Sequence, residues 1–460
     1  MQEVSLFSAA KSHGDSVSLA AKEHLLVFAR MPEPGNTKTR LIPACGADAA
    51  AAISMFLTQK TIRTANRFAA SRGCKVTIHF SGGDTRSMRE AFGAESDYVV
   101  QLGSSLGSRL EHATERSFST GASRVVVIGT DCLELEEEDL EVAFDALHTN
   151  EVVLGPATDG GYYLIGLKHF QPLIFQHIDW GSEFVFAQTK AIAQQCSSSI
   201  VELRPLADVD HPEDLLPLRR KDHRDSSGLF NTVPGRLSVI IPTLNEASCL
   251  RECMAALGPL DDTLEIIVVD AGSLDETVAI AKECATKTFI GNAGRAVQLN
   301  AGAAIASGEH LLFLHADSIL PAGYRESIRQ CMSGNSIAGA FRLGIASSSP
   351  GLRIVEWGTN VRSRVLQLPY GDQGVFMRTS TFFDMGGYRK MPIMEDYELV
   401  ERLRRRGRIQ LLNQTISTSG RRWKKNGIVR TTFLNQLCIA AYKLGVSKNT
   451  ISKLYNGKRA

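Results

Sequence analysis

Short apolar runs recur along the whole chain and are separated by stretches whose apolar residues follow the helical period. The runs consist mainly of Val, Ile, Leu and Phe without regular polar alternation, which is typical of parallel strands buried on both faces. They are LLVFA from 25, KVTIHF from 75, VVVIG from 125, LSVII from 237, EIIVV from 265 and LLFL from 311. The pattern predicts an α/β fold.

The chain is expected to divide into two similar halves. Residues 219–235 are charged, contain Ser and Gly and show no period, which is typical of a linker. We therefore expect one domain over 23–218, a second over 236–460, and a loose tail over 1–22. Each half begins with a strand that runs into a Pro-containing loop and later has an apolar strand followed by a single Asp. This repetition indicates two copies of one architecture.

Composition excludes several classes of protein. The 460 residues are 43% hydrophobic and 22% charged, with a formal net charge of +2, so a disordered chain is excluded. No apolar run approaches the roughly 18 to 20 residues that cross a bilayer, and the N-terminal residues do not form a secretion signal. The nine cysteines form no C-x-x-C pair, which favours a reducing compartment. We expect a cytoplasmic protein.

Positive charge is concentrated at the carboxyl end. Residues 402–460 contain 15 Lys or Arg and no Asp or Glu, whereas residues 1–401 contain 36 basic and 49 acidic residues. Such a surface could bind substrate phosphates, anionic lipid headgroups or nucleic acid, or could offset the acidic remainder of the molecule. Peripheral contact with an anionic membrane is therefore open at this point.

Three acidic residues of the second half follow predicted strands. They are Glu246, Asp270 and Asp317. Ligands of open parallel sheets bind beyond the carboxyl ends of the strands, so these carboxylates should converge on one crevice.

The order of motifs in the second half resembles the family-2 glycosyltransferases of the GT-A fold. The motifs are LSVIIPTLNE, VVDAGSLDET, FLHAD, GDQG, MEDYEL and RRW, between about residues 237 and 455. The likeness is greatest to the soluble subgroup called transferase 2, associated with radical-SAM/selenodomain proteins, which shares GRAVQLNAGAA, YGDQGVF and TSGRRW.

The resemblance implies a nucleotide-sugar donor and a divalent cation, Mg²⁺ or Mn²⁺. Asp317 is the candidate metal ligand, and His315 stands where the family has the first Asp of Asp-x-Asp, so it either touches the metal or only packs. Glu246 and Asp270 would hold the nucleoside, and Arg295 could reach the donor.

The resemblance also assigns the chemical step. An inverting displacement needs one base that deprotonates the acceptor hydroxyl, and the family places it at Asp396, with Glu395 as the alternative. The loop and basic-aromatic segment expected to approach the pyrophosphate or acceptor contain Asp372, Gln373, Gly374, Arg421, Arg422 and Trp423.

The segment 444–459 has the Gly turn and Ser/Thr-rich second helix of a helix-turn-helix. It follows the transferase motifs without a break and has no three-helix domain of its own. We therefore expect a terminal helical cap and no nucleic-acid partner.

The first half has its own motifs. The segment LLVFARMPEPGNTKTRL places Lys38 and Arg40 after a strand, as in nucleotidyltransferases that wrap a nucleoside triphosphate, and Lys and Arg suit triphosphate oxygens. Together with QLGSSLGSRL, VVVIGTDCLEL, GPATDGGYYLIGL, IDWGS and DVDHPEDL it resembles the DUF2064 family over residues 24 to about 217. This family is called transferase 1 of the same association.

The resemblance implies a metal and a substrate loop in the first half as well. Asp131, Asp208 and Asp210 occupy positions that hold one or two magnesium ions in related nucleotidyltransferases. Alternation along Asp-Val-Asp puts both carboxylates on one face of an extended strand, with the valine turned inward. Asp159 and Gly160 resemble a loop that lets the backbone approach a ligand.

The sequence thus predicts two GT-A domains in tandem. The second would be a metal-dependent inverting glycosyltransferase with a hydroxyl-bearing acceptor, and the first would transfer nucleotidyl groups or bind a nucleotide sugar. Two alternatives stay open: a single glycosyltransferase acting on a lipid or carotenoid at a membrane surface, with a non-catalytic first domain, and a nucleotide-sugar sensor or DNA-binding regulator without turnover.

Overall fold

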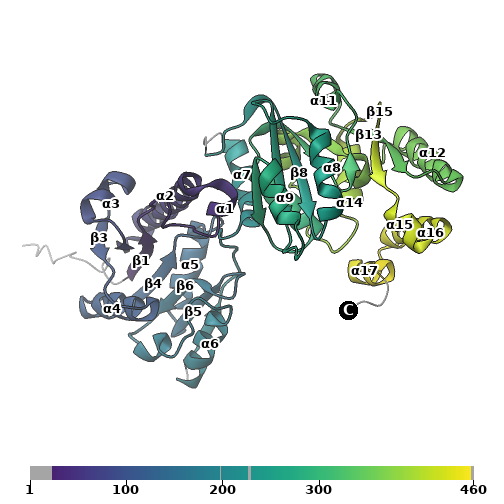
Figure 1. Ribbon diagram of the computed structural model, residues 1–460. Coiled ribbons are helices and arrows are strands. Elements are labelled where there is room, and N and C mark those ends of the chain that lie inside the picture. The colour runs from purple at the N-terminus through teal and green to yellow at the C-terminus, as the bar shows by residue number, and fades with distance from the viewer. Residues whose placement is uncertain (1–22, 197, 226–228, 457–460) are drawn as a thin grey trace, which may run out of the picture. The chain divides into compact units, whose positions relative to one another are not determined.

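The computed structural model describes residues 23–196, 198–225 and 229–456, and the tail expected over 1–22 lies outside them. By its internal contacts the chain forms two compact units (Figure 1). The first consists of Met1–Pro32 and Ser54–Asp208, and the second of Glu33–Ile53 and Val209–Ala460. The units are described separately below.

The first unit contains a seven-stranded sheet in the order β3-β2-β1-β4-β6-β5-β7. Strand β6 runs antiparallel to β4 and β5, and the remaining pairs are parallel. The strands are β1 (Glu23–Arg30), β2 (Lys75–Ser81), β3 (Asp97–Val100), β4 (Arg124–Gly129), β5 (Val152–Pro156), β6 (Tyr162–Leu167) and β7 (Ile200–Glu202).

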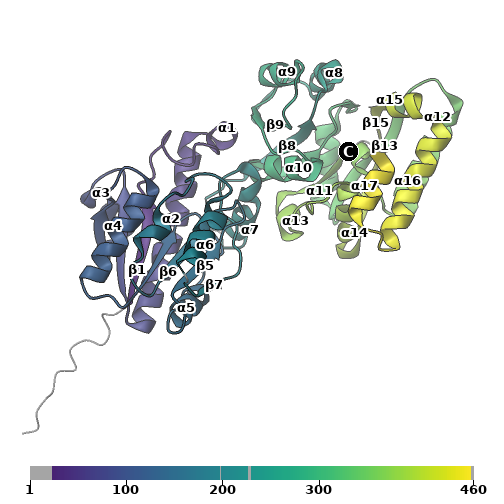
Figure 2. The ribbon, with the colours of Figure 1, turned by 90° about the horizontal axis from the view of Figure 1, so that it is seen from below.

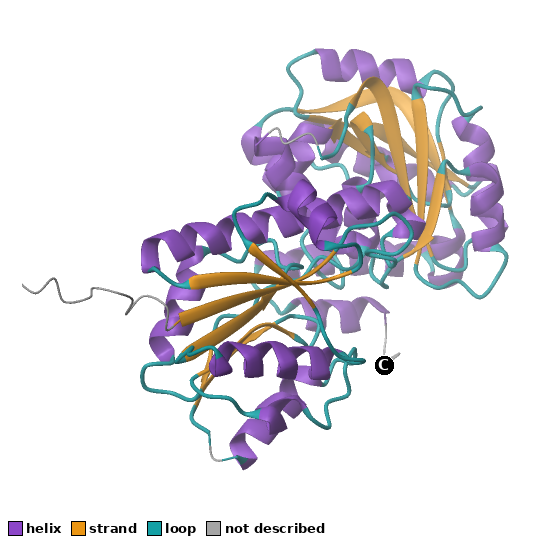
Figure 3. Cartoon of the chain, turned by 90° about the vertical axis from the view of Figure 1, so that its left-hand side faces the viewer, coloured by secondary structure: helices purple, strands orange, loops and turns teal. Residues whose placement is uncertain are grey.

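Both faces of this sheet are buried, as the unbroken apolar runs predict. Leu25 and Val27 of β1 pack into one core cluster, whereas the intervening Leu26 packs into another on the opposite face. Figure 3 shows helices on either side of the sheet. The helices of this unit are α2 (Ala47–Arg72), whose first turns belong to the second unit, α3 (Thr85–Phe92), α4 (Leu106–Ser119), α5 (Glu137–Ala146) and α6 (Val185–Gln195), with a short turn of helix, η2 (Pro172–Phe175). The short helix α1 (Ile42–Cys45) belongs to the second unit.

The second unit contains an eight-stranded sheet in the order β10-β9-β8-β11-β14-β13-β15-β12. Its strands are β8 (Val233–Thr243), β9 (Leu264–Asp270), β10 (Lys287–Ile290), β11 (Gly308–Phe313), β12 (Ser318–Ile319), β13 (Ala338–Ala346), β14 (Val375–Arg378) and β15 (Ile409–Ser419). Strand β14 runs antiparallel to β11 and β13, as β6 does to β4 and β5, and β12 is added at the edge. The α/β class and the repetition of one architecture in two tandem sheets are confirmed.

The helices of the second unit surround this sheet (Figures 1 and 2). Helix α10 approaches β8 so closely that a Cβ on Gly302 would lie 2.5 Å from Cγ2 of Ile240, which requires glycine there. The remaining elements are η3 (Pro212–Asp214), α7 (Leu215–Asp225), α8 (Ala247–Leu257), α9 (Thr277–Cys284), α10 (Arg295–Ala304), α11 (Tyr324–Ser333), α12 (Pro350–Val365), η4 (Gly371–Gln373), α13 (Thr379–Asp384), α14 (Glu395–Arg406), α15 (Arg421–Asn426), α16 (Ile428–Lys443) and α17 (Lys448–Asn456).

The segment expected to be a linker, 219–235, differs from a free connector. Its first residues belong to helix α7, and β8 begins at Val233. Arg219 is buried, donates a 2.9 Å hydrogen bond to the carbonyl of Ala306, and lies over the rings of Phe230 and Phe383. Charged composition suggested a linker because the sequence does not reveal that this guanidinium is stacked and buried.

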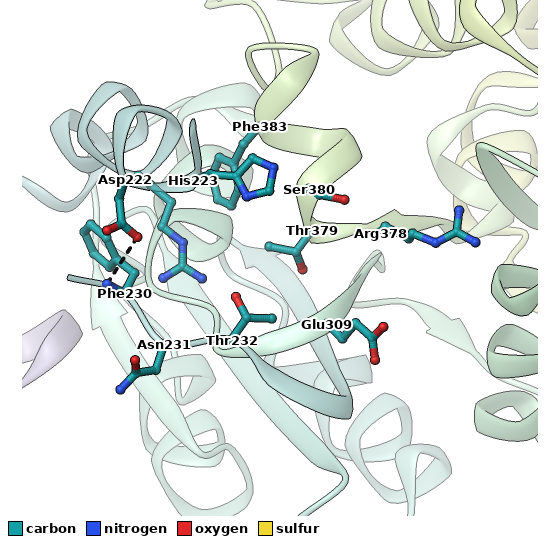
Figure 4. Close-up of a pocket in the computed structure, with 11 residues that line it drawn as sticks. Asp222, His223, Phe230, Asn231, Thr232, Glu309, Arg378, Thr379, Ser380 and Phe383 are labelled. Atoms are coloured by element: carbon teal, nitrogen blue, oxygen red, sulfur yellow. Dashed lines mark hydrogen bonds between the residues drawn. The ribbon is translucent and has the colours of Figure 1, made fainter. Parts of the chain in front are cut away.

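A pocket of about 410 Å³ lies beside α7, and Figure 4 shows the residues that line it. Both carboxylate oxygens of Asp222 accept backbone N–H groups, from Leu229 and Phe230, at 2.8 and 3.3 Å. These contacts tie the end of α7, which belongs to the second unit, to the segment that leads into β8. Within the described residues, no helix has the length and apolar character needed to cross a membrane.

Candidate active site

A cavity of about 650 Å³ in the second unit brings together most of the predicted site residues. It lies beyond the carboxyl ends of the parallel strands β8 and β11. The predicted residues that line it are Glu246, Arg295, His315, Asp317, Asp372, Glu395, Asp396 and Trp423.

The carboxylate of Asp396 is held by backbone groups. Its Oδ2 accepts a 2.8 Å hydrogen bond from the N–H of Gly371, and its Oδ1 accepts one of 2.7 Å from the N–H of Tyr397. A Cβ on Gly371 would lie 3.1 Å from Asp396 Oδ2 and from His315 Nε2. Glycine at this position therefore allows the loop, the carboxylate and the imidazole to meet.

Glu395, the neighbouring acid, has a different environment. Its side chain is buried, and burial together with the charge of Asp396 raises its pKa. Arg295 Nη1 lies 3.6 Å from Glu395 Oε1 and opposes this rise. Asp396 is only half-buried, so it presents more of its carboxylate to the cavity than Glu395 does.

Asp372 is half-buried, and its Oδ1 is buried without a hydrogen-bond partner among the described residues. Burial raises its pKa to about 6, against the opposing charge of Arg362. A buried carboxylate oxygen without a partner is costly, so Asp372 destabilises the ligand-free fold when it is charged.

Arg421 joins two carboxylates at the edge of the cavity. Its Nη2 lies 2.8 Å from Glu246 Oε2 and 3.5 Å from Asp317 Oδ2. Burial and the nearby charge of Glu246 raise the pKa of Asp317. Burial and the charge of Arg295 lower the pKa of His315 to about 3, so its imidazole is neutral at physiological pH.

The cavity is suited to a divalent cation whose coordination shell is completed by oxygen atoms of the substrate. Its described lining contains five carboxylates and one guanidinium, a surplus of negative charge that would repel a diphosphate. Among residues 23–196, 198–225 and 229–456, no three His, Cys, Asp or Glu side chains are grouped so as to hold a metal on their own. The arrangement fits a divalent ion that takes Asp317 and few other protein ligands, because such ions accept substrate phosphates and water as the remaining ligands.

Besides Arg421, which lies at the edge of the cavity, three predicted residues with described positions do not line it. Asp270 is fully buried, and its carboxylate accepts four hydrogen bonds, from Thr243, Gly272 and both the N–H and the hydroxyl of Ser273. Gln373 is also buried. Its side-chain N–H donates to the carbonyl of Phe341, and its side-chain oxygen accepts a hydrogen bond from the hydroxyl of Ser363. A Cβ on Gly374, the third of these, would meet Phe341 and Ile416 of the core. In this structure the three residues shape the loops around the cavity.

The carboxyl-terminal helices form part of the cavity wall. Trp423 of α15 lines it as predicted, and the side chain of Arg422 lies outside the described part of the structure. Residues that the sequence did not single out complete the wall, among them Tyr370, Tyr397, Asn435, Cys438, Ile439 and Tyr455. Tyr455 belongs to α17, so the segment that imitates a helix-turn-helix packs on the site. Tyr455 is the single aromatic residue of this polar terminal helix. In the sequence, this was the feature that could have indicated that the helix packs on the site.

In the first unit, the chain brings the segments of Asp131 and Asp208 together. Asp131 follows β4, and the next residue, Cys132, forms an antiparallel bridge with Asp208. Val209 is buried between the half-exposed Asp208 and Asp210, which is the alternation expected of an extended Asp-Val-Asp segment.

The two basic residues predicted to meet a triphosphate form ion pairs with Asp210. Lys38 Nζ lies 2.9 Å from its Oδ1 and Arg40 Nη1 3.2 Å from its Oδ2. Burial alone would raise the pKa of Asp210, but the charges of Lys38 and Arg40 outweigh it and lower the pKa. Lys38 is almost fully buried, so this pairing is a structural feature of the loop.

Asp159 and Gly160 form a tight turn in the first unit. Asp159 Oδ1 accepts a 2.8 Å hydrogen bond from the N–H of Gly161. Gly160 has φ of +95°, and a Cβ there would lie 2.1 Å from the carbonyl oxygen of Glu183. This position therefore requires glycine because another part of the backbone lies against it.

Comparison with known families gives the class of each half. Residues 238–347 match the family model described as glycosyl transferase family 2, and residues 64–182 match that of an uncharacterized protein conserved in bacteria, DUF2064. The chain thus carries a DUF2064 region and a glycosyl transferase family 2 region in tandem, which confirms the predicted fusion.

Individual relatives match parts of the chain. The uncharacterized glycosyltransferase YibD of Escherichia coli K12 is 38% identical over 97 residues, covering 19% of this chain and 28% of that protein. A PGL/p-HBAD biosynthesis glycosyltransferase of Mycobacterium bovis BCG is 35% identical over 96 residues, covering 18% and 36%. The chain therefore spans about a third or less of the length of these curated relatives.

Among solved structures, a "putative nucleotide-diphospho-sugar transferase" from Desulfovibrio desulfuricans G20 is 31% identical and covers 45% of this chain and 90% of that one, with a TM-score of 0.41.

Proposed function

We propose that the second unit transfers a glycosyl group from a nucleotide-diphosphate sugar to a hydroxyl acceptor, with inversion at the anomeric carbon. The observation that carries this proposal is the convergence of Asp317 and Asp396 on one cavity within the unit that holds the glycosyl transferase family 2 region. Asp317 belongs to the motif FLHAD and Asp396 to the motif MEDYEL, which are separate in the sequence, and the fold brings their carboxylates together.

Asp396 is assigned as the base. The acceptor hydroxyl would give its proton to the Asp396 carboxylate as its oxygen bonds to the anomeric carbon and the bond from that carbon to the diphosphate breaks. The N–H groups of Gly371 and Tyr397 orient the carboxylate before the acceptor arrives, which removes an entropic part of the barrier. Glu395 is the alternative base.

Asp317 is assigned to the donor side. A divalent cation, Mg²⁺ or Mn²⁺, held by Asp317 would neutralise the leaving diphosphate. His315 is neutral and lies in the same cavity, so it can offer a nitrogen to the ion or a hydrogen bond to the donor. Arg421, which already spans Glu246 and Asp317, supplies positive charge on the same side.

The test compares two variants after a thermal-shift screen of nucleotide sugars with Mg²⁺ and Mn²⁺ has identified a donor. Asp396→Asn should lower the transfer rate by about 10²- to 10⁴-fold and leave donor affinity nearly unchanged. Asp317→Asn should weaken donor binding in the presence of metal and leave metal-free binding little changed. Asp262→Asn, which removes an exposed carboxylate of the same unit, is the matched control.

Two outcomes would contradict the assignment. Near-normal turnover in Asp396→Asn would make Glu395 the next candidate base. Tight donor binding without any turnover in the native protein would favour a sensor instead of an enzyme.

We also propose that the first unit binds a nucleotide or a nucleotide sugar with Mg²⁺ at Asp131 and Asp208, and that it transfers nucleotidyl groups or presents the sugar nucleotide. The support is that its sheet has the strand order of the second unit and that the Cys132–Asp208 bridge brings these two segments together. Asp208→Asn should abolish metal-dependent nucleotide binding there and spare binding in the second unit. Unchanged metal affinity in titration calorimetry would refute this assignment.

A further inference from the structure

Helix α12 carries an exposed apolar stripe. Ile354, Trp357, Val361 and Val365 follow one another at spacings of three and four residues, so they share one face of the helix. Trp357 is 69% exposed, and Ile354 and Val365 are similarly exposed. The opposite face of the helix is buried through residues such as Leu352. A stripe of this kind, with a large aromatic residue in it, marks an interaction surface.

Helix α16 carries a second stripe of the same kind. Val429, Phe433 and Leu437 recur every four residues, and Phe433 is 66% exposed. Helices α12 and α16 lie side by side (Figures 1 and 2). Their inner faces share one small core cluster, which includes Leu352 of α12 and Ile428 of α16.

The charges around the two stripes are almost all positive. Helix α12 contains three Arg, and residues 421–456 contain eight Lys or Arg. The one acid in these segments, Glu356, is nearly buried and is bonded to Arg353 and the N–H of Ile345. In α16, Arg430 and Lys443 stand on either side of the apolar stripe.

We propose that the exposed faces of α12 and α16 dock the protein on an anionic lipid surface. Helix α12 is amphipathic, and a helical surface that exposes apolar and aromatic residues beside basic ones lies in the headgroup region of a bilayer. Each basic residue near an anionic surface adds about 1 kcal/mol. A second copy of this chain fits the surface less well, because its own surplus of positive charge would face the same charge on the first.

This docking surface also faces away from one wall of the candidate active site. Asn435, Cys438 and Ile439 on another face of α16 line the cavity. A docked protein would therefore hold its cavity one helix diameter, roughly 10 Å, from the membrane surface, and the acceptor hydroxyl would belong to a membrane-resident lipid. This statement about the acceptor rests on the proposed glycosyl transfer, whereas the docking does not.

The test is flotation of the full chain with vesicles of phosphatidylcholine alone and with vesicles that also contain phosphatidylglycerol. The native protein should float with the anionic vesicles, and salt should weaken the binding. Trp357→Glu combined with Phe433→Glu should abolish it, and Val142→Glu, at an exposed apolar position of α5, should not. Arg430→Gln combined with Lys443→Gln should weaken binding by roughly 30-fold.

Several outcomes would overturn the proposal. They are equal binding to neutral and anionic vesicles, unchanged binding of the Trp357/Phe433 variant, and a native dimer in sedimentation velocity that this variant converts to a monomer. Thermal unfolding of each variant checks that the fold persists, and the Arg430/Lys443 pair keeps the test valid if the double Glu variant unfolds. Because vesicle binding is read without turnover, a failure here and a failure of glycosyl transfer are distinguishable.

Discussion

Replacing Asp372 with Asn should stabilise the ligand-free protein at neutral and alkaline pH. Asp372 is half-buried at the cavity, its buried Oδ1 has no partner among the described residues, and desolvation raises its pKa from 3.8 to about 6. Because the pKa is higher in the folded protein, the folded state binds more protons between these two values. Its stability is therefore lost as pH rises from 3.8 through 6.

The size of the effect follows from the shift. One pKa unit corresponds to about 1.4 kcal/mol, so the shift from 3.8 to about 6 costs the folded state up to about 3 kcal/mol above pH 6. Asn has nearly the same shape and no charge, so Asp372→Asn should recover most of this free energy of unfolding. Below pH 3.8 the native carboxylate is protonated in both states, and the gain should disappear.

The assay is urea unfolding followed by tryptophan fluorescence across this pH range, without metal or nucleotide. Trp423 lines the same cavity and reports on the second unit. Asp262→Asn, at an exposed carboxylate, is the control and should leave stability unchanged at every pH. A variant that is no more stable than the native protein above pH 6, or equally stabilised below pH 3.8, would refute the reasoning.

Two further predictions concern a buried histidine and a glycine. Burial lowers the pKa of His79 to about 4, so stability should fall by up to about 3 kcal/mol between pH 6.5 and 4 as the unfolded chain gains the proton. His79→Phe, which keeps a ring stacked on Phe28, should flatten that part of the pH profile in urea unfolding, and an unchanged slope would contradict it. Gly371→Ala adds a methyl group 3.1 Å from Asp396 Oδ2 and should lower the proposed transfer rate by roughly 10²-fold with little change in donor affinity. Loss of donor binding instead would show that the loop acts on the donor side.

The local pattern of the sequence was sufficient for the central strands of both sheets, β1, β2, β4, β8, β9 and β11. Unbroken apolar runs such as 125–128 and 266–269 become strands buried on both faces. Consecutive residues of a strand point to opposite faces of the sheet, so a run of apolar residues indicates that both faces are buried. The strand-end position of Glu246 and Asp317 likewise follows from where the apolar runs stop. These carboxylates line the cavity for that reason, since parallel strands end at one edge of a sheet.

The partners of individual charges depended on the tertiary structure. Asp270 is the last residue of β9, yet its carboxylate does not face the cavity, because it accepts hydrogen bonds from backbone N–H groups of the loop that comes after it. The fold pairs both Lys38 and Arg40 with Asp210, which is far away in the sequence. The sequence shows that a charged residue is present at a position. It does not show which oppositely charged residue lies beside it in the folded chain.

The carboxyl-terminal helices show the same division. Their positive charge can be read from residues 402–460, because it is a local property. That Asn435, Cys438 and Tyr455 close the cavity, and that α12 lies beside α16, could not be read, because these contacts join segments that are separate in the sequence. The sequence by itself determined the central strands, the strand-end acids and the distribution of charge. The tertiary structure alone decided which of these groups face one another, because such long-range contacts are set by how whole elements pack.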